Sequence, residues 1–205
     1  MPNKSMITQP KQKRGRERVE AILNAASELF AEVGYESATI IEIAARANTS
    51  VGSMYQFFAN KEAILFAIVE RYVAAASVTF ANMEVESFPE MTLEQSIKAI
   101  IVPLKAFIKD NRDFKVIFAT ARGPAFLEAT IRAMDEGMLA RTDAALAQAR
   151  PNISAAERRK YSLVCMVIMK AMLGMTTTNT ELSFDEIFEE MEAVYLRYLL
   201  PVMGE

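Results

Sequence analysis

Four residues between positions 48 and 53 are small and polar, and their side chains could hydrogen-bond a phosphate group or the edge of a base: Asn48, Thr49, Ser50 and Ser53. Asn48 tolerates the left-handed backbone that ends a helix, and Thr49 or Ser50 can cap the helix that follows. Gly52 and Ser53 leave little side chain at the start of that helix, so its backbone can approach an anion or a base closely. The chemistry that this stretch favours is recognition by hydrogen bonds.

Catalytic chemistry has few candidates in the rest of the sequence. The chain contains no His and a single Cys, Cys165. Without His there are no Ser-His or Cys-His pairs and no imidazole metal ligands, which leaves carboxylates or a Lys as the only available bases. Cys165 lies in an apolar run, residues 163–169, where a buried small hydrophobe is favoured over a reactive thiol. We therefore expect no enzyme activity, no metal site and no cofactor.

Charge is distributed unevenly along the chain, although the net charge is only −3. Residues 1–18 hold six basic side chains against Glu17 alone, whereas residues 62–205 hold 15 basic and 20 acidic side chains. A basic arm ahead of an acidic body is expected when one end of a protein faces phosphates. A solvated tail with no partner explains the same charges equally well.

Targeting and membrane signals are not evident in the sequence. The first four residues are not followed by an apolar segment, which argues against a signal peptide. No apolar run reaches the roughly 18 residues of a membrane span, since even residues 163–169 end at Lys170. We expect a cytoplasmic protein with no membrane partner.

Apolar spacing and capping residues predict three short helices that lead into a long one. Apolar residues recur at helical spacing from Val19 to Val33, and Gly34 follows as a stop. Thr39 and Glu42 form a capping box at the start of the next helix. The predicted helices in this half are 19–33, 39–47, 51–58 and a long helix that Asn60 caps.

The remaining sequence is also helical in pattern. Capping boxes start at Thr92, Ser154 and Ser183, and Pro or Gly residues separate the segments. The predicted helices are 92–109, 111–121, 124–149, 154–175 and 183–200. The expected fold class is all-α.

Two short helices joined by a tight turn, the second beginning with small polar residues, have the form of a DNA-reading element. The second helix of such a pair fits the major groove of DNA, about 12 Å wide, with its first residues toward the base edges. Residues 37–61 are therefore interpreted as a helix-turn-helix.

Residues 16–72 resemble the N-terminal domain of TetR-family regulators. The residues that carry the resemblance are Ala25-Ala26, Leu29-Phe30, Gly34-Tyr35, Thr39, Ile43-Ala44, Ala47, Ser50, Gly52, Tyr55, Phe58, Lys61-Glu62 and Leu65. The resemblance implies a flexible basic arm over 1–15, a DNA-binding domain over 16–61, and an effector-binding and dimerisation domain over 62–205. It also implies a homodimer on a palindromic double-stranded DNA operator, released as a repressor by a small, mostly apolar effector.

The resemblance assigns DNA contacts position by position. Thr39, Ser50, Tyr55 and Lys61 match positions that hold the phosphate backbone. The base-facing stretch is Val51, Gly52, Ser53, Gln56 and Phe57. Thr39 has the alternative role of a helix cap only, and Phe57 that of a packing residue.

This sequence departs from the family pattern at the turn and in the recognition helix. The turn reads Ala47-Asn48-Thr49-Ser50 where Ala-Gly-Val-Ser is more common, and Gln56-Phe57 stands where Tyr-His or a similar pair is frequent. The recognition helix also lacks Arg, which makes the most common contact to guanine. The operator of a relative therefore cannot be transferred to this chain.

The effector pocket and the dimer interface rest on the resemblance more than on motifs. The last two helices are expected to pair with those of a second subunit, and an apolar stripe on each is compatible with this. Apolar and polar candidates for the pocket are Phe107, Phe114, Phe118, Arg112, Arg122 and Tyr161. The alternatives are an activator of the same family, and a helical binding protein or enzyme with an incidental helix-turn-helix.

Overall fold

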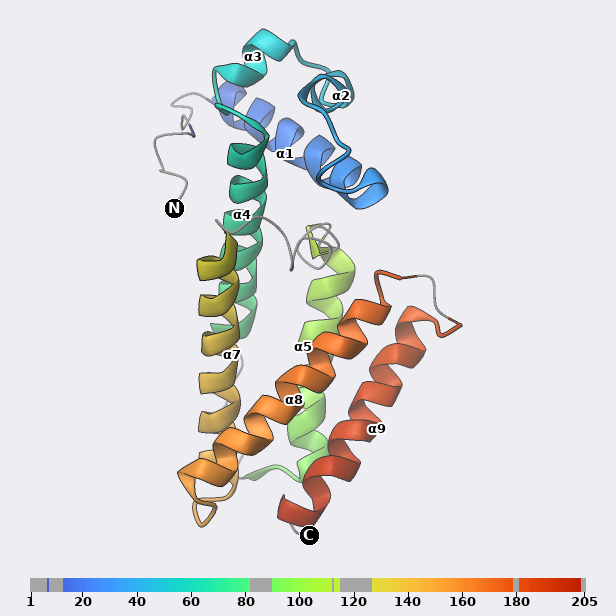
Figure 1. Cartoon of the computed structure of the whole chain (residues 1–205). Coiled ribbons are helices and arrows are strands. Elements are labelled where there is room, and N and C mark those ends of the chain that lie inside the picture. The colour runs from blue at the N-terminus through green and yellow to red at the C-terminus, as the bar shows by residue number, and fades with distance from the viewer. Residues whose placement is uncertain are drawn as a thin grey trace. The chain divides into compact units, whose positions relative to one another are not determined.

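The computed structural model describes residue 7 and residues 13–81, 90–111, 113–114, 127–178 and 181–203. These residues form eight α-helices, and their one piece of β-structure is a bridge between Ile7 and Phe58. The all-α prediction is confirmed (Figure 1). The described residues fall into two compact units, Met1–Ser77 with Asp110–Glu128, and Val78–Lys109 with Ala129–Glu205.

The first unit is built from α1, α2, α3 and most of α4 around one apolar core. The bounds are α1 Lys13–Val33, α2 Ile40–Arg46, α3 Val51–Tyr55 and α4 Lys61–Ala81. Each helix contributes a side chain that is at most 1% exposed: Phe30, Ile43, Met54 and Ile64. Burial of each such side chain contributes roughly 1.5–3 kcal/mol, so the short helices α2 and α3 are held by packing more than by their own propensity.

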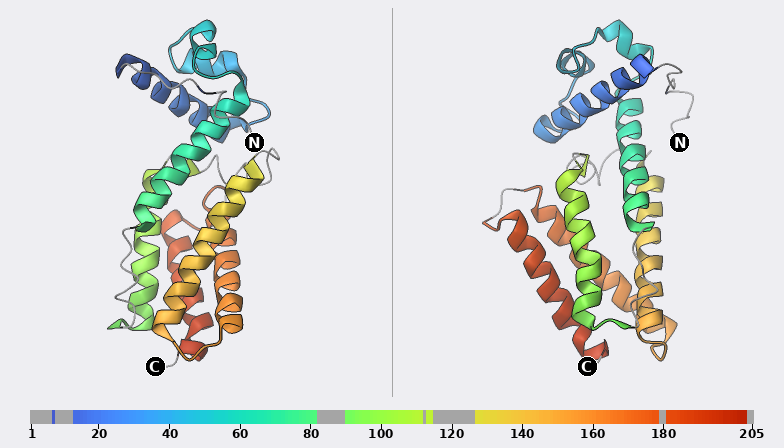
Figure 2. Two further views of the ribbon diagram at one scale, coloured as in Figure 1. Left: turned by 90° about the vertical axis from the view of Figure 1, so that its left-hand side faces the viewer. Right: turned by 180° about the vertical axis from the view of Figure 1, so that it is seen from behind.

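The second unit contains α5 (Leu93–Asp110), α7 (Glu128–Ala149), α8 (Ala155–Met175) and α9 (Phe184–Met203). Two end residues, Asp110 of α5 and Glu128 of α7, belong to the first unit. α8 and α9 pack against each other, and Figure 2 shows the two helices from two further directions. The buried Tyr195 hydroxyl of α9 donates to the backbone carbonyl of Cys165 at 2.8 Å. Ion pairs tie α5 to α9 (Lys105–Asp185, 2.6 Å) and α7 to α8 (Lys170–Asp135, 2.7 Å).

All four predicted capping boxes form, so helix starts are placed where the sequence predicts them. In each, the cap hydroxyl accepts from the backbone three residues on, and the Glu or Gln side chain accepts from the backbone of the cap residue. The caps are Thr39, Ser154, Thr92 and Ser183. These bonds satisfy N–H groups that a helix start otherwise leaves unpaired.

Helix lengths differ from the prediction where apolar spacing is not the deciding signal. α1 begins at Lys13, ahead of the predicted start at Val19, because its first turns are charged and carry no apolar pattern. α3 ends at Tyr55 and not at Phe58, because Phe58 is 1% exposed in the core and pairs with Ile7 in the β-bridge. Most of the predicted helix over 111–121, and most of the basic arm, lies outside the described residues.

Candidate nucleic-acid interface

The first element of the candidate interface is the start of α2. The Thr39 hydroxyl accepts a hydrogen bond from the Glu42 N–H (3.2 Å) and donates to the Glu42 carboxylate (2.7 Å), which also accepts from the Thr39 N–H (2.9 Å). The bonds from the Thr39 side chain and backbone hold the pKa of Glu42 below its usual value. Thr39 therefore acts as a helix cap in this structure, whether or not it also meets a phosphate.

The turn between α2 and α3 is tight because Asn48 adopts a left-handed conformation, with φ 49°. The Thr49 N–H then donates back to the carbonyl of Ala44 at 3.0 Å. The Ser50 hydroxyl caps α3 by accepting from the Ser53 N–H at 3.1 Å. Asn is one of the few residues other than Gly that tolerates this backbone, as the sequence indicated.

α3 presents one face to solvent and the opposite face to the core. Gly52, Tyr55 and Gln56 are exposed, and Tyr55 is 53% exposed despite its large ring. Met54 points the other way and is 1% exposed. The remaining predicted base-facing residues, Val51, Ser53 and Phe57, are half-buried on the flanks. The structure thus gathers all of the predicted contacts in residues 50–57 on one short helix and its ends.

No contact within the described part of the chain requires a glycine at position 52. A Cβ added there would meet no described atom within 4 Å, and its φ is not in the left-handed region. Glycine is also less favourable than Ala inside a helix by about 0.5–1 kcal/mol. Nothing among the described residues therefore blocks another molecule from approaching the backbone at Gly52 closely.

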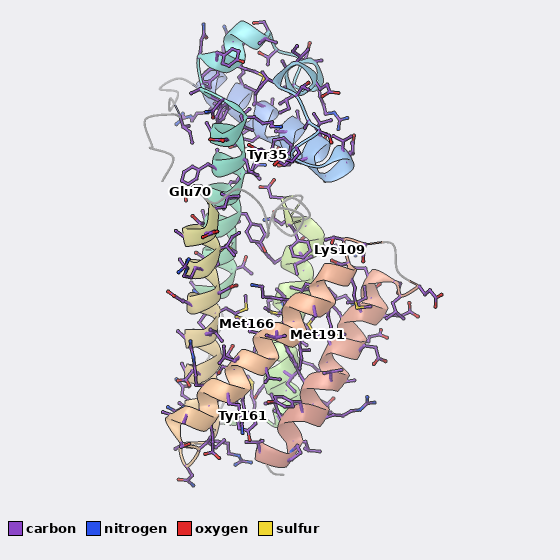
Figure 3. The ribbon with its side chains drawn as sticks, viewed as in Figure 1. Tyr35, Glu70, Lys109, Tyr161, Met166 and Met191 are labelled. Carbon is purple, nitrogen blue, oxygen red and sulfur yellow. The ribbon has the colours of Figure 1, made fainter. Side chains whose placement is uncertain are left out.

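Lys61 makes contacts within the protein that differ from the phosphate contact predicted for it. Its ammonium donates to the backbone carbonyls of Tyr35 (2.6 Å), Glu36 (3.1 Å) and Ala38 (2.9 Å), and it lies 4.5 Å from the centre of the Tyr35 ring. Tyr35 is labelled in Figure 3. Because an ammonium has three N–H donors, Lys61 would have to release a carbonyl to bind a phosphate. It clamps the α1–α2 connection onto the start of α4.

Arg18 joins the interface although sequence reasoning did not single it out. This exposed α1 residue donates from a guanidinium nitrogen to the hydroxyl of Ser53 at 3.2 Å. The only signal in the sequence was its place in the basic N-terminal segment. The contact brings a cation against a recognition helix that has none of its own.

A buried ionic cluster lies deeper in the same unit. Arg71 of α4 donates two hydrogen bonds to the carboxylate of Asp113, at 2.8 and 2.7 Å, and a third to Glu20 of α1 at 2.8 Å. The Ser27 hydroxyl also donates to Asp113 at 2.6 Å. Burial by itself lowers the pKa of Arg71, but the bonds and charges of Asp113 and Glu20 outweigh it and raise that pKa. Asp113, which follows α5, is thereby fastened to α1 and α4.

Three of the six predicted effector residues lie within the described part of the chain. Phe107 is half-buried on α5, and Tyr161 lies on α8 (Figure 3), where it packs edge-on against Tyr198 with the ring centres 5.8 Å apart. Phe114 is buried in the first unit. The other three candidates, Arg112, Phe118 and Arg122, lie outside the described residues.

Three further features of the described residues concern metal ligands, the one cysteine and helix hydropathy. No group of three or more His, Cys, Asp or Glu among the described residues could hold a metal ion. Cys165 is buried, and burial raises the pKa of its thiol to about 11. None of the described helices combines the length and apolar character needed to cross a bilayer.

The sequence matches two families along most of its length. "Bacterial regulatory proteins, tetR family" matches residues 22–68, and "Tetracyclin repressor-like, C-terminal domain" matches residues 92–199. The HTH-type transcriptional regulator HbdR of Aromatoleum sp. (strain CIB) is 46% identical over 63 residues, which cover 31% of this chain. That match spans only 27% of the length of HbdR.

Solved structures share the fold over nearly the whole chain. The fatty acid degradation regulator FadR from Bacillus halodurans has a TM-score of 0.67 and 18% identity, covering 92% of this chain and 97% of its own. AibR, solved with isovaleryl coenzyme A and operator DNA, has a TM-score of 0.64 and 18% identity, covering 86% and 97%. Because the C-terminal match alone covers more than half of the sequence, this chain belongs to the TetR family of bacterial regulatory proteins.

Proposed function

We propose that this protein is a transcription regulator that binds a palindromic DNA operator through residues 16–61. Residues 62–205 bind a small, mostly apolar effector and form a homodimer. The single observation that carries the proposal is the solvent-facing side of α3, where Gly52, Tyr55 and Gln56 stand exposed on a helix whose other side is anchored in the core. Such a regulator works in the cytoplasm, where its DNA lies.

Each exposed group has a chemical partner on DNA. Ser50 and Tyr55 hydroxyls donate to phosphate oxygens, as would Thr39 or Lys61 if their present bonds were exchanged. Gln56 can pair with adenine through two hydrogen bonds, worth about 1–3 kcal/mol of discrimination, and Val51 can contact a thymine methyl. Ser53 completes the base-facing stretch, and the half-buried Phe57 contributes packing or a thymine contact.

Gly52→Ala separates DNA binding from folding. The added methyl meets no protein atom, so the melting temperature should not fall, whereas affinity for promoter DNA should drop at least tenfold if the backbone touches DNA. Gly137→Ala on α7 is the matched control, because Gly137 is also exposed with open space around its Cα. Affinity unchanged in Gly52→Ala would refute the placement of α3 in the groove. Wild-type protein without selective, salt-sensitive binding would refute the regulator function and favour a helical binding protein or enzyme.

Dimerisation through α8 and α9 is supported by apolar side chains left in solvent. Leu163 and Val167 lie one turn apart on α8, and Leu200 is exposed on α9. A second copy of the chain would bury them. Val167→Glu should therefore produce monomers in analytical ultracentrifugation, whereas Val102→Glu on α5 should not, although both valines are 61% exposed. Dimers of Val167→Glu as stable as wild type would refute this interface.

The response to an effector requires a connection between the C-terminal part of the chain and α1. Asp113 supplies one, because it lies within the segment that matches the C-terminal domain and bonds to Ser27 and Arg71. An effector shifts DNA binding only if it binds the two conformations unequally. A thermal-shift screen of acyl compounds, followed by release of DNA, tests this. Phe107, Phe114 and Tyr161 are the candidates for mutation among the described residues. Loss of transcription without the protein would indicate an activator instead of a repressor.

A further inference from the structure

Arg18 stands out among the basic residues of α1 because its side chain reaches the recognition helix. One guanidinium nitrogen lies 3.2 Å from the Ser53 hydroxyl, while the residue as a whole is exposed. No carboxylate within the described part of the chain pairs with Arg18. Guanidinium has five N–H donors, so four remain after the bond to Ser53.

The position of Ser53 on α3 decides what those donors face. Successive residues of a helix are about 100° apart, so Ser53 lies between the exposed side, with Gly52 and Gln56, and the buried Met54. When the exposed side of a helix enters the major groove, its centre faces the bases and its flanks face the groove walls. The walls are lined by phosphates. Arg18 therefore extends along the flank that meets a phosphate backbone.

The charge pattern of α1 also calls for an external anion. Arg14 lies four residues before Arg18, on the same side of the helix, and both are exposed. Like charges at this spacing destabilise a helix by a few tenths of a kcal/mol. The first turn contains Lys13 and Arg14 and no acidic residue, which opposes the helix dipole. A phosphate beside this side of α1 would offset both effects.

We propose that Arg18 is a DNA phosphate-binding residue that grips the groove wall beside α3 and is positioned by Ser53. The inference rests on the proposed function and adds a cationic contact that the recognition helix itself lacks. Ser53 then accepts from Arg18 and keeps its own O–H to donate to a base. The Arg18–Ser53 pair, from two helices, thus contributes both to recognition of the base sequence and to affinity for the DNA phosphate backbone.

The test measures binding to the promoter DNA of the protein's own gene and to a shuffled duplex of equal length, across a salt series. Each phosphate contact contributes about 0.9 to the steepness of the plot of log affinity against log salt. Between 1 M and 0.1 M salt, one such contact therefore contributes roughly eightfold in affinity. Arg18→Ala should lose about that factor per protomer on both duplexes and flatten the slope accordingly. Arg18→Lys should keep the slope and recover part of the affinity.

Arg16→Ala is the matched control, because Arg16 is exposed on the same helix but about 200° around it from Arg18. Its loss should be smaller. Ser53→Ala should weaken binding less once Arg18 is already Ala, since Ser53 acts partly by holding Arg18. Equal losses in Arg16→Ala and Arg18→Ala would overturn the inference, as would an Arg18→Ala loss confined to the promoter duplex. Wild type that binds neither duplex would overturn the proposed function itself.

Discussion

Replacement of Asp113 by Asn tests how strongly the buried ionic cluster holds the first unit together. Asp113 is 3% exposed and Ser27 is 1% exposed, so water cannot replace the bonds that the carboxylate loses. The substitution keeps the volume but removes the charge that accepts two hydrogen bonds from Arg71 and one from Ser27. The Arg71 guanidinium is then left with Glu20 as its only counter-charge among the described residues.

Removal of one partner of a buried ion pair lowers the free energy of unfolding by about 3–5 kcal/mol. Because Arg71 keeps its ion pair with Glu20, the loss should lie near about 3 kcal/mol. For a chain of this size each kcal/mol lowers the melting temperature by about 2–4 °C, so Asp113→Asn should lower it by roughly 6–12 °C. Urea unfolding followed by circular dichroism should show a lower midpoint with a similar slope.

Glu94→Gln is the control, because its ion pair with Lys98 is exposed on both sides and water screens it, so its loss should change stability very little. A second control replaces the pair as a whole. Arg71→Met with Asp113→Leu should cost less than Asp113→Asn alone, since an apolar pair leaves no buried charge without a partner. If Asp113→Asn were as mild as Glu94→Gln, the reasoning from desolvation would be wrong.

Three other substitutions and conditions follow from local geometry. Lys61→Met should lower the free energy of unfolding by about 1–3 kcal/mol and also lower DNA affinity, because three backbone carbonyls lose their donor. An unchanged melting temperature with lost DNA binding would show that these three hydrogen bonds do not stabilise the fold. Asn48→Val should cost about 1–2 kcal/mol at its φ of 49°, whereas Asn48→Gly should not, as urea titration can show. The Cys165 thiol should resist iodoacetamide at pH 8 until the protein is unfolded, because burial raises its pKa to about 11. The unfolded thiol ionises near 9.0, so this group favours the folded state below pH 9 and that contribution is lost as the pH rises toward 11; rapid native alkylation would contradict its burial.

Local features of the sequence determined the helices and the turn between α2 and α3. A capping box joins residues three positions apart, and a left-handed Asn needs only its own backbone, so neither depends on the rest of the chain. The four boxes and Asn48 are therefore where the pattern predicts them. The same holds for the resemblance to the family, since apolar and small residues at fixed spacing define its first domain.

Tertiary structure decided what the charged residues do. Lys61 was expected on a phosphate, yet its carbonyl partners lie 23 to 26 positions earlier in the chain. Arg18 meets Ser53 from 35 positions away, and Ser27 meets Asp113 from 86. Such partners depend on how helices pack, which spacing along one helix does not specify. The sequence by itself indicated that α3 could read DNA, whereas only the tertiary arrangement of α1 and α3 brought Arg18 to the flank of α3.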